Sequence, residues 1–420
     1  MSLAAISIIL LVIVLICSMF VPINVGIQAF FALYLYFFIA GNGFAKALAG
    51  FPVSLFMMLM AMLIFFAYAT VNGTLDNLCK IILKNLKGKV WTLPIIVFVV
   101  TACLSAAGPS GFIVLAIAPI AMSLTTKSGI SPTLMAIMLC NGGSAGGLSP
   151  VSAGGIVAAS FIDKMGLPAA TASIVNQLFI NGIIANIVIC ILAYFLFGGM
   201  KLIKNPKVIS VEDLTAEPMN WKQKVNLGLI GLMIVLVVGF KADIAIVCIC
   251  LALVAAILKL ADENQVFKRV NWGVLVMVVG IVTFIGAVTS AGGISMVTDY
   301  ISKSQNANLV LALIGFAPGV VSSYSTSTGV VLPAFMPLIG DLIHKMPNIH
   351  YMAFLSTMGF CTYIVDASPL STAGAACVAA STEDTDKKKI YRELLLWGFG
   401  ACFLATIISV VLFGWIMYPV

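Results

Sequence analysis

Long apolar stretches alternate with short polar ones along the whole chain, which predicts a series of membrane-spanning helices. An α-helix needs about 20 predominantly apolar residues to cross the hydrocarbon core of a bilayer. We predict ten spanning segments of this kind, five in each half of the chain. They begin near Leu3, Gly26, Pro52, Pro132, Ala169, Val225, Asp243, Trp272, Tyr351 and Leu394.

Two further apolar stretches, at about 90–122 and about 308–343, are each interrupted by small and polar residues. The interruptions read GPSG at 108–111 and STSTG at 325–329. A lipid-exposed break in backbone hydrogen bonding is costly, so irregular backbone at membrane depth is tolerated only where it is buried in protein or lines a cavity. Each stretch is therefore predicted to form a re-entrant helical hairpin.

One short motif occurs twice, as GLSPVSAGG at 147–155 and as DASPLSTAG at 366–374. Ser149, Pro150, Ser152 and Gly155 align without a gap on Ser368, Pro369, Ser371 and Gly374. The two hairpin interruptions follow nearly the same offset, because Gly111 precedes Gly329 by about the same number of residues. The pattern predicts an internal repeat whose two copies together form one site.

The fold that follows is an all-α integral membrane protein built from two repeats, each with five transmembrane helices and one hairpin. The first repeat covers 1–205, with a hairpin at about 90–122 and a broken helix at about 132–162. A cytoplasmic linker at 206–224 leads to the second repeat at 225–420, with a hairpin at about 308–343 and a broken helix at about 351–381. An odd number of spans per repeat turns the second copy upside down relative to the first.

The repeated motif also predicts where each broken helix resumes at the midplane. After the glycine-rich run NGGSAGG at 141–147, Ser149 is expected to be an N-cap and Pro150 to lie in the first helical turn. Ser368 and Pro369 are expected to do the same in the second repeat. Helix N-termini attract anions and the carbonyl ends of the preceding half-helices attract cations, so both kinds of site are expected together.

Composition agrees with a membrane protein, since 62% of the residues are hydrophobic and only 9% are charged. The first apolar run, 3–20, has no basic residues before it and no small-residue cleavage site after it, so it is read as a membrane helix and not as a removable signal peptide. The ten cysteines form no CxxC pair and there are only two histidines. A disulfide framework or a structural zinc site is therefore not expected.

The distribution of basic residues predicts the orientation in the membrane. With the first hairpin opening from the cytoplasm, all but five of the 22 basic residues fall on the cytoplasmic side, as the positive-inside rule requires. The five on the other side are Lys46, Lys164, Lys241, Lys303 and Lys345. The net charge of +7 is therefore explained by the orientation of the chain in the membrane and gives no reason to expect a nucleic-acid partner.

Several runs resemble the MatC-type malonate and dicarboxylate carrier family. They are VPINVG at 21–26, FPVSLFMML at 51–59, VNGTLDNL at 71–78, GISPTLMAIML at 129–139 and VDASPLSTAG at 365–374. That family is similar in layout to the ion-transporter superfamily, which includes the divalent anion–sodium symporters. The resemblance implies a homodimer in the cytoplasmic (inner) membrane that works by an elevator motion and binds sodium and carboxylate at its hairpin tips.

The expected site combines the hairpin tips with the two helix breaks. The residues expected to bind substrate are Pro109, Ser110, Gly111, Ser149, Pro150, Ser327, Thr328, Ser368, Pro369 and Ser371. The residues expected to bind a coupling cation, Na+ with H+ as the alternative, are Gly108, Asn141, Gly143, Ser144, Ser325, Thr326 and Asp366. Competing explanations are helix packing for the glycines, hydrogen bonds within one helix for the hydroxyls, and capping of the next half-helix for Asp366.

These features favour a secondary active transporter of small three- to four-carbon dicarboxylates, such as malonate or succinate, that works by cation-coupled symport. The alternative is a cation/proton antiporter or oxyanion exporter on the same scaffold. An antiporter is expected to carry several buried ionisable groups, whereas only Asp366 falls clearly in mid-span. An enzyme is not expected, because the sequence has no HExxH, no GxSxG and no histidine pair within a span.

Overall fold

The computed structural model describes residues 2–419 except 22, 42–49, 85–87, 109, 205–207, 210–217, 305 and 382–384. Within these residues, seven helices are long and apolar enough to cross a membrane, and shorter apolar helices lie between them. A two-residue strand, β1 (Gly88–Lys89), pairs antiparallel with β2 (Val208–Ile209). The prediction of a helical, multi-pass membrane protein is confirmed, with this short ladder as the one exception in the described chain.

The first half of the chain contains the following helices. They are α1 (Leu3–Phe20), α2 (Val25–Ile39), α4 (Val53–Val71), α5 (Thr74–Lys84), η1 (Val90–Thr92), α6 (Leu93–Ala107), α7 (Ser110–Ser128), α8 (Pro132–Gly146), α9 (Ala153–Ile162), α10 (Thr171–Leu196) and α11 (Gly199–Lys204). Helices α6 and α7 flank the first predicted hairpin tip, and α8 and α9 flank a break at 147–152.

The second half of the chain contains the remaining helices. They are α12 (Trp221–Ile234) with η2 (Val235–Gly239), α13 (Ile244–Ile257), α14 (Glu263–Arg269), α15 (Trp272–Ser290), α16 (Gly293–Ser302), α17 (Ala307–Ser322), η3 (Ser327–Val331), α18 (Leu332–Lys345), α19 (Tyr351–Ile364), η4 (Val365–Ala367), α20 (Thr372–Ala380) and α21 (Lys387–Ser409) with η5 (Val410–Met417). Here α17, η3 and α18 form the second hairpin, and η4 separates the two parts of the second broken helix.

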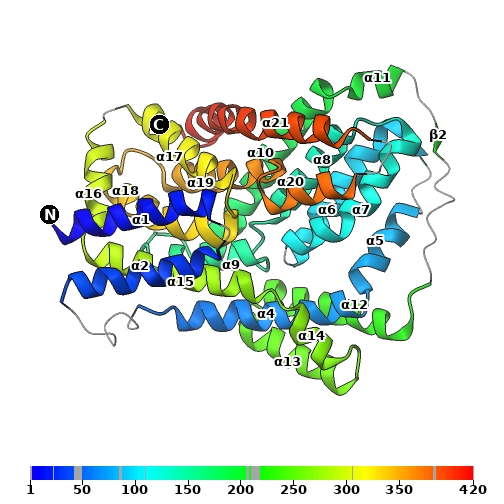
Figure 1. Cartoon of the computed structure of the whole chain (residues 1–420), viewed down its shortest axis with the longest axis horizontal. Helices are drawn as coiled ribbons and strands as arrows, with labels where there is room; N and C mark the ends of the chain where they lie inside the picture. Colours follow the sequence, from blue (N-terminus) through cyan, green and yellow to red (C-terminus); the bar gives the residue numbers. More distant parts are fainter. Residues whose placement is uncertain are drawn as a thin grey trace.

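The helices form two groups (Figure 1). In the first, called the scaffold group (α1, α2, α4, α12, α13 and α15), α2 packs against α15 and α4 packs against α13. Glycine permits the first of these contacts, since a Cβ on Gly26 would lie 2.2 Å from the carbonyl oxygen of Val276. The second, called the hairpin group, comprises α6 to α10 and α17 to α21. Most of the scaffold group lies along the lower edge of Figure 1, and α21 lies along the upper edge.

The start of α21 corrects one predicted boundary. The helix begins at Lys387, seven residues before the predicted start at Leu394. Asp386 is its N-cap, because its Oδ1 accepts a hydrogen bond from the backbone N–H of Lys389 at 3.0 Å. The first turn is charged and exposed, so a search for apolar residues alone begins too late.

Candidate functional site

The glycine-rich run at 141–147 is helical up to Gly146, so the predicted break at these residues is wrong. These glycines let α8 approach α6 closely. A Cβ on Gly142 would lie 2.6 Å from the carbonyl oxygen of Phe98, and one on Gly146 would lie 2.5 Å from the backbone nitrogen of Ala106. Packing, the competing explanation for the glycines, is therefore the correct one at these two positions.

The first half-helix resumes three residues later than predicted. Helix α9 begins at Ala153, and its N-cap is Ser152, whose Oγ accepts from the N–H of Gly155 at 3.2 Å. Ser149 is not the cap, because α9 begins only at Ala153; its hydroxyl donates to the carbonyl oxygen of Ala106 at the end of α6, at 2.6 Å, and accepts from the N–H of Val151 in the turn, at 3.5 Å. Pro150 accordingly lies in the turn before the helix and not in its first turn.

The second break repeats this geometry. Helix α20 begins at Thr372, and the Oγ of Ser371 accepts from the N–H of Gly374 at 3.3 Å. Ser368 and Pro369 lie in the turn before it, so their predicted roles as cap and first turn are wrong. Ser371 has the extended backbone, φ −85° and ψ 161°, that an N-cap requires.

A cavity of about 170 Å³ lies where the two breaks, the second hairpin tip and the scaffold group meet. Leu63 of α4 and Met277 of α15 line its scaffold side, and Leu115 of α7 lines the hairpin side. Seven of the predicted site residues also line it. They are Gly111, Ser325, Thr326, Ser327, Thr328, Asp366 and Ser371.

The other described candidates lie outside this lining. They are Gly108, Asn141, Gly143, Ser144, Ser149, Pro150, Ser368 and Pro369. The Asn141 amide donates towards the sulfur of Cys190 on α10, at 3.5 Å, and a Cβ on Gly143 would lie 2.4 Å from Val114. Pro109 and the side chain of Ser110 lie outside the described residues.

Helix N-termini surround the cavity with backbone N–H groups that have no hydrogen-bond acceptor among the described residues. Several such N–H groups belong to residues of the lining. They are those of Ala153 on α9, Ser327, Thr328 and Gly329 on η3, and Thr372 and Ala373 on α20. Free N–H groups at a helix start carry partial positive charge, so this arrangement favours a bound anion.

Asp366 brings a carboxylate into the same cavity. Its Oδ1 accepts a hydrogen bond from Ser327 Oγ at 2.6 Å, and Ser327 Oγ lies 2.9 Å from Ser322 Oγ. Within the described chain, Oδ2 has no hydrogen-bond partner and no basic side chain forms an ion pair with Asp366. Asp366 does not cap α20, because Ser371 does, so the capping alternative is wrong.

Oxygen atoms that line the same cavity as Asp366 suit a hard monovalent cation. The Ser325 hydroxyl is buried without a hydrogen-bond partner, and the Thr326 hydroxyl contacts only the sulfur of Met277, at 3.5 Å. Hydroxyl, carbonyl and carboxylate oxygens are the ligands that hard cations prefer. Among the described residues, no group of three or more His, Cys, Asp or Glu side chains could hold a metal ion, which leaves mixed oxygen ligands as the option here.

Tyr363 is a site residue that the sequence interpretation missed. Its hydroxyl lies 2.6 Å from Thr328 Oγ1, and its ring lines the cavity. Its backbone carbonyl accepts a hydrogen bond from Ser144 Oγ at 2.8 Å. The only hint in the sequence is that Tyr363 and Ser144 are separated by the repeat offset.

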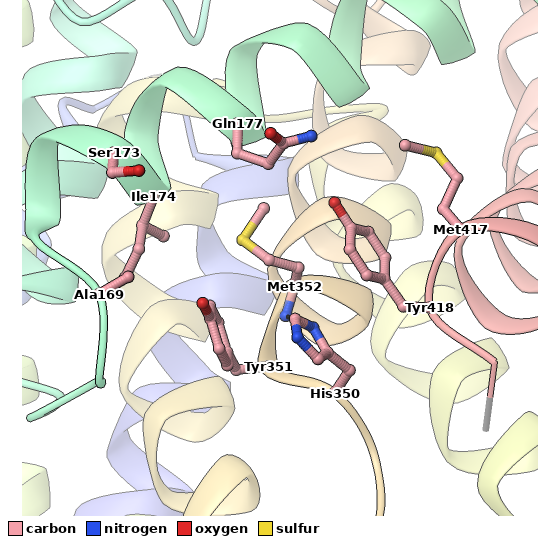
Figure 2. A pocket seen from close by; sticks show the side chains of 9 residues that line it. All are labelled: Ala169, Ser173, Ile174, Gln177, His350, Tyr351, Met352, Met417 and Tyr418. Carbon is pink, nitrogen blue, oxygen red and sulfur yellow. Dashed lines mark hydrogen bonds between the residues drawn. The ribbon is translucent and has the colours of Figure 1, made fainter.

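A second cavity, of about 480 Å³, lies at the starts of α10 and α19 beside the end of the chain. Figure 2 shows the Tyr418 ring between Gln177 and His350. The His350 ring stacks on Tyr418 with ring centres 4.9 Å apart, and the Tyr418 hydroxyl accepts from the Asn181 amide at 3.0 Å. None of the predicted site residues lines this cavity, and its contacts attach the chain end to α19.

The apolar helices support a multi-pass membrane protein, and comparison with known proteins agrees with this conclusion. Residues 1–147 match the family model described as dicarboxylate carrier protein MatC N-terminus. The resemblance to MatC-type dicarboxylate carriers is thereby confirmed over residues 1–147, and the description of that family as a carrier suggests a transporter. A search of curated proteins found no match.

Proposed function

We propose that this protein is a secondary active transporter that carries small dicarboxylates, such as malonate or succinate, across the cytoplasmic membrane together with a cation. The observation that carries the proposal is the convergence of free helix N-terminal N–H groups and the Asp366 carboxylate on one cavity. The N–H groups would bind the carboxylates of the substrate, since the described lining holds no Lys or Arg.

Asp366 supplies the reason for cation coupling in this proposal. A carboxylate at membrane depth needs a compensating positive charge, and a dicarboxylate in the same cavity adds further negative charge. A bound Na+ held by Asp366, Ser325 and Thr326 would meet both needs. A proton on Asp366 is the alternative, and it would neutralise only the carboxylate.

The two hairpin tips differ in a way that supports alternating access. A Cβ on Gly329 would lie 2.2 Å from the Met277 methyl carbon of the scaffold group. The equivalent glycine of the first tip, Gly111, has no described atom within 4 Å of the same position. We infer that the hairpin group moves against the scaffold group, so that the first tip is the one in contact when the second is open.

The proposal includes two inverted repeats, with both chain ends outside, and a homodimer. Single cysteines at Lys127 and at Lys345 test the orientation, because a membrane-impermeant thiol reagent should label the first only from the cytoplasm and the second only from outside. Labelling of both from one side would overturn the inverted arrangement.

Uptake in proteoliposomes tests the function itself. Radiolabelled malonate, succinate, malate and citrate are offered with an inward Na+ gradient, with a pH gradient, or with neither. We expect a dicarboxylate to be concentrated under one of the two gradients. Concentration under the pH gradient alone would assign a proton to Asp366, and uptake of no carboxylate under any condition would remove the proposed function and leave the antiporter or exporter alternative.

A further inference from the structure

Equivalent positions of the two repeats carry very different side chains, and the described cavity lining includes those of the second repeat and not those of the first. Ser144 and Gly147 in the first repeat correspond to Tyr363 and Asp366 in the second, and Gly154 corresponds to Ala373. At two of these three positions the first repeat has a small side chain and the second repeat has a ring or a carboxylate that lines the cavity. Such a difference makes a site built from two similar halves asymmetric.

The glycines of the first repeat make room for the Tyr363 ring. A Cβ on Gly147 would lie 2.6 Å from Cε1 of Tyr363, and one on Gly154 would lie 1.9 Å from its hydroxyl oxygen. Neither distance is possible for a real side chain without movement of the ring. The ring thus occupies the space against the first turn of α9 that side chains at Gly147 and Gly154 would otherwise fill.

Hydrogen bonds hold the ring at this place from two sides. Its hydroxyl pairs with Thr328 on the second hairpin tip, and the backbone carbonyl of Tyr363 accepts from Ser144. The side chain is buried to 98%, with 2% of its surface exposed, yet it lines the cavity. Because the ring is buried and both the hydroxyl and the backbone carbonyl of Tyr363 are hydrogen-bonded, we expect this side of the cavity to be rigid.

We propose that Tyr363 determines the length of the dicarboxylate that the site accepts. The inference rests on the proposed function and extends it to substrate selection. The ring lines the cavity beside the start of α9, so in this proposal it reduces the room for the carbon chain of a longer substrate, whose second carboxylate then cannot reach the N-terminus of α20. The Tyr363 ring excludes longer dicarboxylates by filling space, and the hydrogen bond between its hydroxyl and Thr328 holds the ring in place.

The test compares uptake of malonate, succinate, glutarate and adipate by wild type and three variants in proteoliposomes. Tyr363→Ser places the first-repeat residue at this position, and we expect the ratio of glutarate to malonate uptake to rise at least about tenfold, the scale on which a pocket discriminates one methylene. Tyr363→Phe keeps the ring, and we expect it to preserve the wild-type order of chain lengths.

Gly147→Ala should change selectivity in the opposite direction. This second test does not require that the Tyr363→Ser variant folds. The added Cβ should push the ring into the cavity, so the ratio of succinate to malonate uptake should fall, and adding Tyr363→Ser should restore it. If wild type takes up dicarboxylates and neither Tyr363→Ser nor Gly147→Ala changes the order of chain lengths, the role of Tyr363 is refuted and the transport function stands. If wild type takes up none, the proposed function fails first, and this inference fails with it.

Discussion

The hydroxyl of Ser144 lies 2.8 Å from the backbone carbonyl oxygen of Tyr363, which comes 219 residues later in the chain. The same offset relates Ser149 to Ser368 and Ser152 to Ser371. Two positions that correspond in the repeats are therefore in direct contact. The contact between Ser144 and Tyr363 therefore marks the place where the two halves of the site meet.

Removal of this contact should weaken the association of the two broken helices. We expect Ser144→Ala to lower the free energy of unfolding by about 1 kcal/mol, because the buried carbonyl of Tyr363 loses its side-chain donor and keeps only the backbone N–H of Val365 among the described residues. Thermal unfolding of the purified protein in detergent measures the change. Ser160→Ala is the matched control, since Ser160 donates only to Val157 within its own helix; equal shifts in both variants would mean that the contact between halves adds nothing.

The two hydroxyls of the second tip should contribute unequally to transport. Ser327 donates to Asp366, whereas Thr328 pairs with Tyr363. We expect Ser327→Ala to reduce uptake at least about tenfold, on the scale of a hydrogen bond to a charged group, and Thr328→Ala to reduce it less. Ser323→Ala on the same tip is the control, because Ser323 donates to Val320. Wild-type uptake by Ser327→Ala would show that the Ser327 hydroxyl only packs.

Alanine substitutions at Gly329 and Gly111, the glycines of the two hairpin tips, should affect the melting temperature differently. Gly329→Ala introduces a methyl group against Met277, whereas Gly111→Ala introduces one into open space. We expect Gly329→Ala to reduce the melting temperature and Gly111→Ala to leave it unchanged. Gly329→Ala combined with Met277→Ala should recover the loss. A fall of the same size in Gly111→Ala would contradict the difference between the two tips.

Protonation of His350, whose ring stacks on Tyr418, should make the free energy of unfolding depend on pH. Burial lowers the pKa of His350 from its ordinary value, and its Nδ1 accepts from the N–H of Met352 as the N-cap of α19. The unfolded chain then takes up a proton at a pH where the folded one does not, so stability falls as the pH drops from about 6.5 to the lower folded pKa. We expect His350→Asn, which can still cap, to flatten thermal stability in this range; an unchanged slope would assign the dependence to other groups.

The sequence predicted the helices well because apolar length is a local property. Starts at Leu3, Trp272 and Tyr351 agree with the structure, and each predicted hairpin interruption includes the start of a helix, α7 at Ser110 and η3 at Ser327. The boundary at Leu394 was wrong because an exposed, charged first turn does not look apolar.

The helix breaks were harder to predict, for two physical reasons. A glycine-rich run serves equally well to end a helix and to let two helices approach, and only the neighbouring α6 decides between them. Each repeat also has two serines three residues apart, Ser149 and Ser152 in the first, and either could cap. The partner at Ala106 that engages Ser149 lies 43 residues away and cannot be read from the local sequence.

Tyr363 shows what single-sequence reasoning cannot find. Its ring depends on Gly147 and Gly154, which are more than 200 residues earlier in the chain and become its neighbours only in the folded protein. Asp366 was found, by contrast, because a carboxylate in mid-span is conspicuous without any partner.

Equilibrium binding of radiolabelled succinate and malonate to the purified protein, at increasing Na+ concentration and at several pH values, tests the central claim most directly. The comparison is between wild type, Asp366→Asn, and Asp163→Asn as a control on an exposed carboxylate outside the cavity. We predict that wild type and Asp163→Asn bind a dicarboxylate more tightly as the cation concentration rises, and that Asp366→Asn loses this dependence. Cation-dependent binding of the same strength in Asp366→Asn, or no dicarboxylate binding by wild type, would contradict the claim that this cavity holds substrate and cation together.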